Sequence, residues 1–469
     1  MQFNSITFLL FLAVVLGLHY SLRSWTVRKA NLLLASYIFY AAWNPLFIPL
    51  IIISTISDWL IAGKLGATQN TKLRRLLLVG SLTINLGLLS YCKYTNFLLD
   101  TFNKLIQPLG INYVAPEFDI ILPIGISFYT FQTLSYTIDV YRKRLKPEYS
   151  LLDFSLFVTF FPQLVAGPIV RASFFLPQCA QLTAFQWHNL NWGFLFLIIG
   201  LFQKIVLADS ILAPVVDQVY GDPILTGSLE IWTAILAFSG QIFFDFSGYS
   251  SCAIGVALCL GFVIPLNFRS PYGAIGFSDF WRRWHISLSS WFRDYLYISL
   301  GGNRKSAART RVNLFITMLI AGLWHGASLM FLFWGALHGI YLILERALHK
   351  TVLAQTNTIV RFAYWLMTFT IVSLTWILFR SPDMLTAITM FASLTKPVQV
   401  QVLHLADILS ALIVVCCLLG YHWFTRQTTA YELLSKMRWW FRPLIIAVML
   451  LAILFQSGGD ERAFIYFQF

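Results

Sequence analysis

Long apolar runs alternate with short polar segments along nearly the whole chain. A helix that crosses a membrane needs about 20 apolar residues. The runs that approach this length are Ile6–Leu22, Asn31–Trp43, Leu46–Ala62, Leu76–Tyr91, Ile120–Tyr141, Leu151–Val170, Trp192–Leu207, Ile231–Phe262, Val312–Leu344, Ile359–Phe379, Val402–Phe424 and Pro443–Phe455. Prolines that should kink or interrupt such helices are Pro45, Pro123, Pro162 and Pro168. Because long runs can break in two, the pattern predicts an all-α, polytopic integral membrane protein with about 10–12 membrane-embedded helices.

Lysine and arginine are distributed unevenly between the loops that join the first spans. The basic loops carry Arg23, Arg28 and Lys29, then Lys64, Lys72, Arg74 and Arg75, and then Arg142, Lys143, Arg144 and Lys146. The intervening loops are a turn at Asn44–Pro45 and the segment 93–119, in which acidic residues offset the basic ones. Since basic loops tend to stay in the cytoplasm, we expect an extracytoplasmic N-terminus. With no internal repeat, low-complexity tract or soluble segment, one membrane domain should fill residues 1–469.

Composition agrees with a membrane protein. Of the 469 residues, 58% are hydrophobic and 11% are charged, against about 25% charged in soluble domains. The net charge of +13 would also suit a nucleic-acid-binding protein. However, the basic residues lie in short loops between apolar runs, where they act as topology signals and headgroup contacts. The six cysteines lie mostly inside apolar runs without metal-ligand spacing, which indicates free thiols and no metal site.

The first departure from the apolar pattern is the segment 277–303, FSDFWRRWHISLSSWFRDYLYISLGGN. At helical spacing one face carries Trp281, Trp284, Leu288, Trp291 and Tyr295. The spacing predicts an interfacial amphipathic helix with an aromatic face and a basic rim, ending at Gly301–Gly302–Asn303. Such a helix could serve only as an anchor at the headgroups. The cluster of Arg282, Arg283 and His285, with Asp294 further on, also suits a phosphate-bearing cofactor such as coenzyme A.

The second departure is Val312–Leu344, a run of 33 residues without Asp, Glu, Lys or Arg. His325 lies near its middle between Gly322 and Gly326, and His338 follows. Ionisable groups at this depth are costly and usually face a cavity or a partner. The glycines could unwind or thin the helix and let a substrate approach the ring, and a neutral imidazole can take a proton from a hydroxyl nucleophile. The alternative for either histidine is a hydrogen-bonded packing role, which we assign to His338.

Asp245 is a third candidate, because it lies among phenylalanines within a predicted span. A carboxylate there needs a partner such as an arginine or a histidine N–H. It could orient a catalytic histidine or only join helices, and the sequence leaves both open. Asp139 and Lys204 lie nearer to span ends, which favours structural pairing or snorkelling.

Other enzyme classes lack sequence support. The chain has no P-loop, no G-x-S-x-G elbow, no C-x-x-C zinc pattern and no G-x-G-x-x-G fingerprint. These absences argue against an ATPase, a hydrolase of the nucleophile-elbow type and a dehydrogenase.

A series of ordered motifs nevertheless resembles a known family along nearly the whole chain. The motifs are Leu122–Phe128 with Gln132, Phe161–Pro168, Phe244–Ser250, Asn267–Tyr272, Trp281–His285, Arg293–Asn303, Gly322–Ala327 and the ending Phe464–Phe469. They resemble the membrane-bound O-acyltransferases, and within that family the bacterial alginate O-acetylation branch. One departure is Ser299, where the branch more often has proline. This difference does not touch the chemistry.

The resemblance implies roles for the candidate residues. The family's membrane-embedded catalytic histidine falls on His325, and its second recurrent polar position, usually His or Asn, falls on His285. Apart from the resemblance, the candidates for supporting or orienting roles are Asp245, Trp324 and Asp294, and the candidates for donor binding are Arg282 and Arg283. The resemblance also implies a deep cavity or tunnel that joins the two membrane faces near these residues, with a catalytic core over about residues 120–345.

The resemblance further implies a reaction and its partners. The acyl donor would be acetyl-CoA, used as a substrate from the cytoplasm with no bound cofactor. The acceptor would be an extracytoplasmic polysaccharide such as alginate or another exopolysaccharide, reached through an SGNH-type periplasmic or membrane-anchored transferase. The protein would then lie in the bacterial inner membrane. We hypothesise that His325 is the general base and that His285 positions the reactants or hydrogen-bonds the developing charge.

Several alternatives remain open at this point. Within acyl transfer they are peptidoglycan O-acetylation and teichoic acid D-alanylation from a carrier protein. Outside it they are a polysaccharide transporter, which should show inverted repeats and paired charges at mid-membrane, and a non-catalytic scaffold for a secreted transferase.

Overall fold

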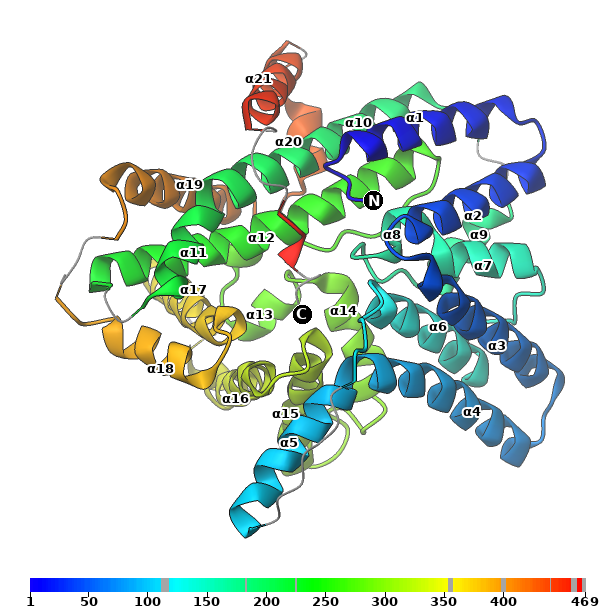
Figure 1. Ribbon diagram of the computed structural model, residues 1–469, viewed down its shortest axis with the longest axis horizontal. Helices are drawn as coiled ribbons and strands as arrows, with labels where there is room; N and C mark the ends of the chain where they lie inside the picture. The colour runs from blue at the N-terminus through cyan, green and yellow to red at the C-terminus, as the bar shows by residue number, and fades with distance from the viewer. Residues whose placement is uncertain are drawn as a thin grey trace. The chain divides into compact units, whose positions relative to one another are not determined.

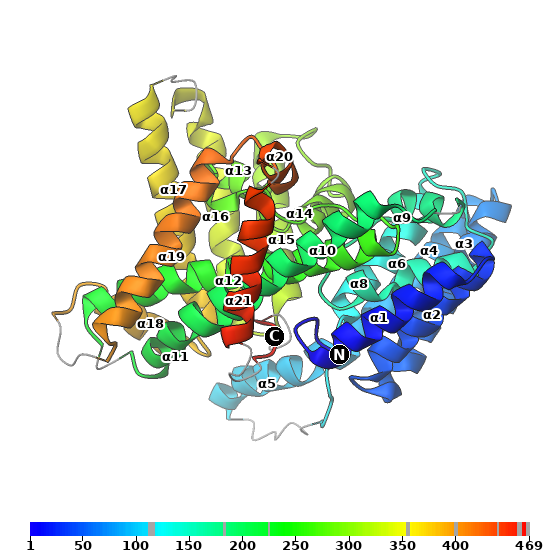
Figure 2. The same ribbon diagram turned by 90° about the horizontal axis from the view of Figure 1, so that it is seen from above.

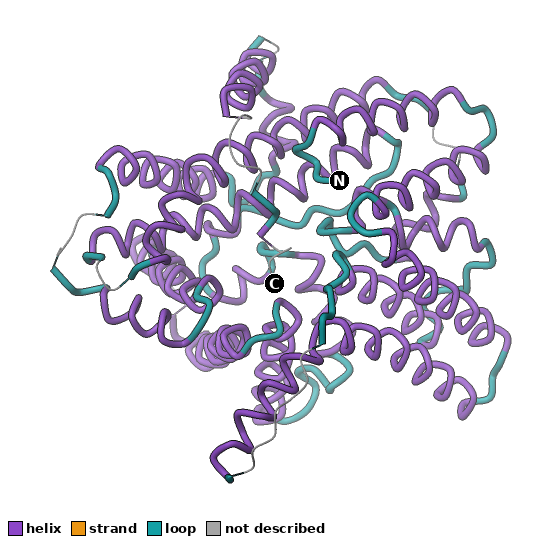
Figure 3. The backbone as a smooth tube through the Cα atoms, viewed as in Figure 1, coloured by secondary structure: helices purple, strands orange, loops and turns teal. Residues whose placement is uncertain are grey.

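The chain folds entirely into helices and connecting loops over the residues that the structure describes. The computed structural model describes residues 1–110, 118–181, 184–223, 226–352, 357–397, 402–438, 440–456 and 462–465, and no strand occurs within these ranges (Figure 3). Residues 111–117 of the predicted loop 93–119 and residues 466–469 of the final motif lie outside the described residues. The prediction of an all-α fold is confirmed.

Seven helical stretches within the described ranges are long and apolar enough to cross a membrane. They are Pro45–Ala67, Thr71–Leu109, Trp187–Gly221, Ser228–Cys259, Leu329–Leu348, Thr358–Arg380 and Leu405–Phe424. Shorter apolar helices occur at Ile6–Ser21, Met384–Ser393 and Phe441–Gln456. The protein is therefore a multi-pass membrane protein.

The helices group into two compact units, and the boundary between them falls inside two long helices. Unit one comprises Met1–Phe194 and Ala253–Pro265, and unit two comprises Leu195–Cys252 and Leu266–Phe469. The expectation of one membrane domain over residues 1–469 stays a prediction.

Unit one is built mostly from the first half of the chain (Figure 1). Its elements are α1 Ile6–Ser21, α2 Trp25–Ala41, η1 Pro45–Phe47, α3 Ile48–Ala67, α4 Thr71–Leu89, η2 Ser90–Tyr94, α5 Thr95–Ile106, η3 Gln107–Leu109, α6 Ile126–Tyr141, α7 Leu151–Thr159, α8 Phe161–Leu164 and α9 Ala172–Cys179. The run Leu151–Val170 breaks into α7 and α8 because Pro162 cannot continue α7 and instead starts the next turn.

Three helices of unit one share a buried polar cluster. Asp58 on α3 accepts hydrogen bonds from Ser81 Oγ at 2.5 Å and from Asn85 Nδ2 at 2.8 Å, both on α4. Thr133 on α6 donates to Asn85 Oδ1 at 3.2 Å. Because polar groups in a membrane must find partners within the protein, these contacts join α3, α4 and α6.

Unit two contains every candidate site residue. Its elements are α10 Trp187–Leu201, which begins in unit one, η4 Phe202–Leu212, α11 Ala213–Gly221, α12 Ser228–Cys259, which ends in unit one, η5 Pro271–Gly273, α13 Phe277–Trp281, α14 Ile286–Trp291, η6 Phe292–Tyr297, α15 Ala307–His325, α16 Leu329–Val352, α17 Thr358–Arg380, α18 Met384–Ser393, α19 Leu405–Phe424, α20 Ala430–Lys436 and α21 Phe441–Gln456. The predicted run Val312–Leu344 is thus a hairpin of two helices.

The core of unit two is strongly aromatic. Trp334 on α16 stacks on Trp376 of α17 with ring centroids 5.8 Å apart, and Trp376 contacts Trp284 at 5.1 Å. Helix α16 packs against α15, α17 and the short helix α13 (Figure 2). Large rings bury much apolar surface with few rotatable bonds, so this core fixes the loops and helix ends that carry the candidate residues.

Candidate active site

His325 is the last residue of α15, at the turn that leads into α16. Gly326 has an extended backbone, with φ −158° and ψ 152°, so the helix stops directly after the histidine. A Cβ on Gly322 would collide with the carbonyl oxygen of Phe331, and a Cβ on Gly335 would collide with that of Met318. The glycine before His325 therefore permits close packing of α15 on α16, and the glycine after it ends the helix.

The His325 ring lies in an aromatic enclosure and is only 3% exposed. Ring centroids lie 5.1 Å away for Trp324 and Trp334 and 5.5 Å away for Phe379, all at steep angles. The His285 ring centroid lies 6.4 Å from that of His325. The two histidines that the sequence singled out, 40 positions apart, are therefore neighbours in the fold.

His285 is fully buried and has an unusual backbone. Its φ of 43° and ψ of 56° lie in the left-handed region, which costs a non-glycine residue about 1–3 kcal/mol. Two backbone hydrogen bonds hold the turn: Ile286 N–H donates to the Asn267 carbonyl at 2.9 Å, and Arg269 N–H donates to the Arg283 carbonyl at 3.0 Å. The turn places the imidazole between two short helices.

The segment 277–303 is consequently not the single amphipathic helix that its spacing predicts. Helix α13 ends at Trp281, and α14 starts only after the left-handed residue His285. The predicted aromatic face is also wrong as a headgroup contact, because four of its members are buried inside unit two: Trp284, Leu288, Trp291 and Tyr295. Spacing alone could not reveal the left-handed residue that interrupts the helix.

Asn267 joins His285 to the start of α14. Its Oδ1 lies 3.1 Å from His285 Nδ1 and accepts hydrogen bonds from Ser287 N–H at 3.3 Å and Ser287 Oγ at 2.9 Å. Its Nδ2 donates to Ser250 Oγ at 3.3 Å. Burial lowers the pKa of His285 to about 3, so the ring is neutral. Sequence reasoning did not single out Asn267, and the available signal was its place at the start of the Asn267–Tyr272 motif.

Asp245 on α12 is paired with Lys204 of η4. The Lys204 Nζ lies 2.5 Å from Asp245 Oδ1 and 2.8 Å from Asp209 Oδ1. The other oxygen of Asp245 accepts the backbone N–H of Ile465 at 3.0 Å. These contacts match the helix-joining interpretation of Asp245. Asp245 affects the histidines indirectly, through the adjacent residue Phe246. The ring centroids of Phe246 and His285 are 4.6 Å apart, in an edge-on arrangement.

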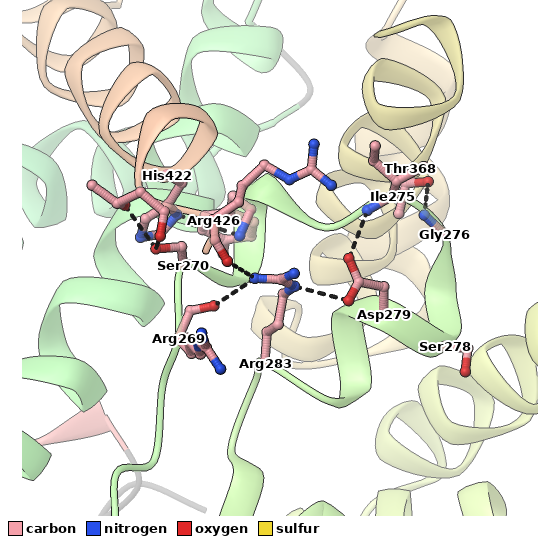
Figure 4. Close-up of polar contacts among 12 residues, drawn as sticks. Arg269, Ser270, Ile275, Gly276, Ser278, Asp279, Arg283, Thr368, His422 and Arg426 are labelled. Atoms are coloured by element: carbon pink, nitrogen blue, oxygen red, sulfur yellow. Dashed lines mark hydrogen bonds and ion pairs between the residues drawn. The ribbon is translucent and has the colours of Figure 1, made fainter. Parts of the chain in front are cut away.

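Arg283 contributes to the structure of the loop that precedes His285. Its Nε lies 2.9 Å from Asp279 Oδ1, and its Nη1 donates to the carbonyl oxygens of Arg426 at 2.8 Å and Arg269 at 3.4 Å (Figure 4). Arg282, in contrast, is exposed. The donor-binding role of both residues stays a prediction.

Trp324 and Asp294 are the remaining residues of the predicted site, and Trp324 lies beside the two histidines. Trp324 contacts both histidine rings, at 5.1 Å from His325 and 6.0 Å from His285. Asp294 forms an ion pair with Arg293, with Nε and Oδ1 2.7 Å apart. Its hydrogen bond is the main reason that the pKa of Arg293 is raised.

His338 on α16 has the packing role predicted for it. It is fully buried, and its Nε2 lies 3.3 Å from Thr375 Oγ1. Its ring lies 4.8 Å from Trp334, whose other neighbours include His325. Among the described residues, no group of three or more His, Cys, Asp or Glu is arranged to hold a metal ion.

Comparison with known proteins identifies relatives over most of the chain. The model of the membrane-bound O-acyltransferase family matches residues 3–381. A probable alginate O-acetylase AlgI of Azotobacter vinelandii is 42% identical over 403 residues, which cover 84% of this chain and 78% of that protein. A peptidoglycan O-acetyltransferase of Helicobacter pylori is 36% identical over 404 residues, covering 81% and 76%. A teichoic acid D-alanyltransferase of Streptococcus thermophilus is 29% identical over 242 residues, covering 48% and 57%.

The matched stretch contains both buried histidines and the broken helices that present them. Its length and the identity of the relatives exceed what chance similarity between apolar sequences produces. The multi-pass helical fold agrees with a membrane-bound enzyme and gives no separate support to a transporter or scaffold. The chain belongs to the membrane-bound O-acyltransferase family and is an O-acyltransferase.

Proposed function

We propose that this O-acyltransferase transfers acetyl groups to hydroxyl groups of an extracytoplasmic polysaccharide, such as alginate or another exopolysaccharide. The observation that carries the proposal is the pair of buried imidazoles with ring centroids 6.4 Å apart. A probable alginate O-acetylase is 42% identical to this chain over an alignment that covers 84% of it. This relationship supports acetyl as the transferred group and a polysaccharide as the acceptor.

In the proposed reaction His325 is the general base. One of its ring nitrogens takes the proton of an acceptor hydroxyl while the oxygen attacks the acetyl carbonyl carbon of a thioester. The new C–O bond forms, the C–S bond breaks, and the proton passes to the departing thiolate. Burial among aromatic rings excludes water, which would otherwise hydrolyse the thioester.

The neighbouring residues support the base. His285 faces His325 and positions the reactants, while Trp324 contacts both rings and limits their rotation. Asp245 acts at a distance, because its pairing with Lys204 fixes the part of α12 that carries Phe246 against His285. Asp294, paired with Arg293, belongs to the helical turn that follows α14.

The donor in this proposal is acetyl-CoA, which enters from the cytoplasm. Exposed Arg282 suits a phosphate contact, while Arg283 holds the adjoining loop. The basic loops of unit one favour an inner-membrane protein with its N-terminus outside the cytoplasm. An SGNH-type extracytoplasmic transferase would then complete delivery of the acetyl group to the polymer.

The test uses the full-length protein in a bacterium whose own copy of the gene is deleted. Acetate released by mild alkali from exopolysaccharide and from cell wall is measured for wild type, His325→Ala and His338→Gln. We expect His325→Ala to lose about 10²–10⁴-fold in acetylation at normal protein abundance. The matched variant His338→Gln removes another buried histidine beside Trp334 and should retain acetylation. Normal acetylation by His325→Ala would exclude the proposed base.

Peptidoglycan is the second candidate acceptor, because a peptidoglycan O-acetyltransferase is 36% identical over 81% of this chain. The same measurement separates the two acceptors. Loss of acetate from the cell wall alone would assign peptidoglycan, and loss from exopolysaccharide alone would assign the proposed acceptor. Loss of ester-linked alanine, with no change in acetate, would instead indicate D-alanylation.

A further inference from the structure

The orientation of the Asn267 side chain is fixed by a neighbouring backbone group. The oxygen and the nitrogen of a side-chain amide have nearly the same size and geometry, so their hydrogen-bond partners identify them. The backbone N–H of Ser287 points at the atom 3.3 Å away, and a backbone N–H can only donate. That atom of Asn267 is therefore the oxygen, and the amide nitrogen is the atom that faces Ser250.

This orientation decides which nitrogen of His285 carries the proton. The oxygen of Asn267 lies 3.1 Å from Nδ1 of His285 and can only accept. Nδ1 must therefore carry a hydrogen. The buried ring is neutral and has one N–H in total. Nε2 of His285 is consequently the nitrogen with the lone pair.

We propose that Asn267 is a positioning residue that holds His285 in the Nδ1–H tautomer, so that Nε2 acts as a hydrogen-bond acceptor during acyl transfer. The inference rests on the proposed function. It also narrows the role of His285, because a lone pair at Nε2 cannot donate a hydrogen bond to a developing oxyanion. Of the two roles expected from the sequence, positioning the reactants is the one that fits this tautomer.

An amide suits this task better than a carboxylate would. Both accept a hydrogen bond from Nδ1, but a carboxylate would also stabilise the imidazolium and raise the pKa of the ring. Burial is the main cause of the low pKa of His285. Of the titratable groups near His285, His325 on α15 has its ring next to that of His285. The carboxylate on α12, Asp245, is already paired with Lys204. A neutral orienting group therefore keeps the ring uncharged and the lone pair of Nε2 available as a hydrogen-bond acceptor.

The direct test is the protonation state of the two nitrogens. Full-length protein labelled with ¹⁵N-histidine is placed in lipid bilayers, and the His285 signals are assigned by their loss in His285→Gln. We expect a protonated Nδ1 and a lone-pair Nε2 in wild type, and a mixture of tautomers in Asn267→Ala. Asn267→Asp should keep Nδ1 protonated and shift protonation of Nε2 to higher pH. A protonated Nε2 in the wild-type protein, or an unchanged tautomer in Asn267→Ala, overturns the inference.

Acetylation by the same variants tests the consequence for the reaction. We expect Asn267→Ala to lower the rate roughly 10–100-fold, mainly through kcat. The matched control is Asn313→Ala, because Asn313 is also fully buried in unit two and donates to a carbonyl, that of Gly302, at 3.0 Å. Its rate per folded molecule should stay within about twofold of wild type. A changed tautomer with normal acetylation would show that Asn267 orients His285 but that His285 has no part in the reaction, which overturns the positioning role.

Discussion

The two units each contain a buried polar cluster, and the backbone around the two clusters differs. In unit one, Asp58 is saturated by neutral donors from α4, and the three helices that supply the cluster run through it without interruption. In unit two, His285 lies in a left-handed turn between α13 and α14, and His325 is the final residue of α15. Continuous helices around saturated groups indicate a structural role. Helices that stop at an ionisable side chain indicate a different role, and the proposed function uses both of these histidines.

The largest effect expected from this comparison is loss of chemistry without loss of structure at His285. His285→Gly removes the ring but suits the φ of 43°, because glycine adopts the left-handed region without strain. We expect acetylation to fall by about 10²-fold or more, with the protein still folded and melting at a higher temperature than His285→Ala. His285→Ala should lose a similar amount of activity and also some stability, because alanine is strained there. Retention of acetylation by the glycine variant would remove His285 from the mechanism.

The converse effect is expected at Asp58. Asp58→Ala leaves Ser81 and Asn85 with unmet hydrogen bonds inside the membrane domain, at a cost of about 1–3 kcal/mol. Thermal unfolding in detergent should therefore occur at a lower temperature, while acetylation per folded molecule stays normal. Asp58→Asn keeps one acceptor oxygen, so its unfolding temperature should lie between those of the wild type and Asp58→Ala. A stable Asp58→Ala protein that has lost its activity would contradict the structural role of this cluster.

The smallest effects are expected at the two adjacent arginines. Arg283→Gln breaks the ion pair with Asp279 and two hydrogen bonds to carbonyls, and we expect a loss of about 1 kcal/mol in stability. Arg282→Gln should leave stability unchanged and raise the KM for acetyl-CoA a few-fold, because its exposed guanidinium suits a phosphate. An unchanged KM in the Arg282 variant would place the donor phosphates elsewhere.

The sequence was sufficient to predict the class of fold, and it singled out both histidines of the candidate site. Apolar runs predict spanning helices because the membrane requires both length and internal backbone hydrogen bonds. His325 is visible as an ionisable residue in a run of 33 residues without Asp, Glu, Lys or Arg. Its proximity to His285 is not visible, because it depends on the packing of α15 and α16 against the aromatic core.

What the sequence could not reveal depends on backbone conformation and on partners distant in the chain. The residue types around His285 do not indicate a left-handed backbone. Helical spacing therefore predicts one continuous helix through His285, and with it the wrong aromatic face. The partner of Asp245 is Lys204, 41 residues earlier, rather than an arginine or a histidine. Asn267 went unnoticed because a single asparagine has no periodic signal.

The glycine contact between α15 and α16 has a consequence for motion in unit two. Where two backbones touch, no side chain can rearrange to let one helix slide along the other, so the hairpin behaves as one rigid body. The rings of His325 and Trp334 can then change their relative position only by rotation about the side-chain bonds of these two residues. Any larger opening beside this ring has to come from displacement of the elements around the hairpin, such as α17 and η6.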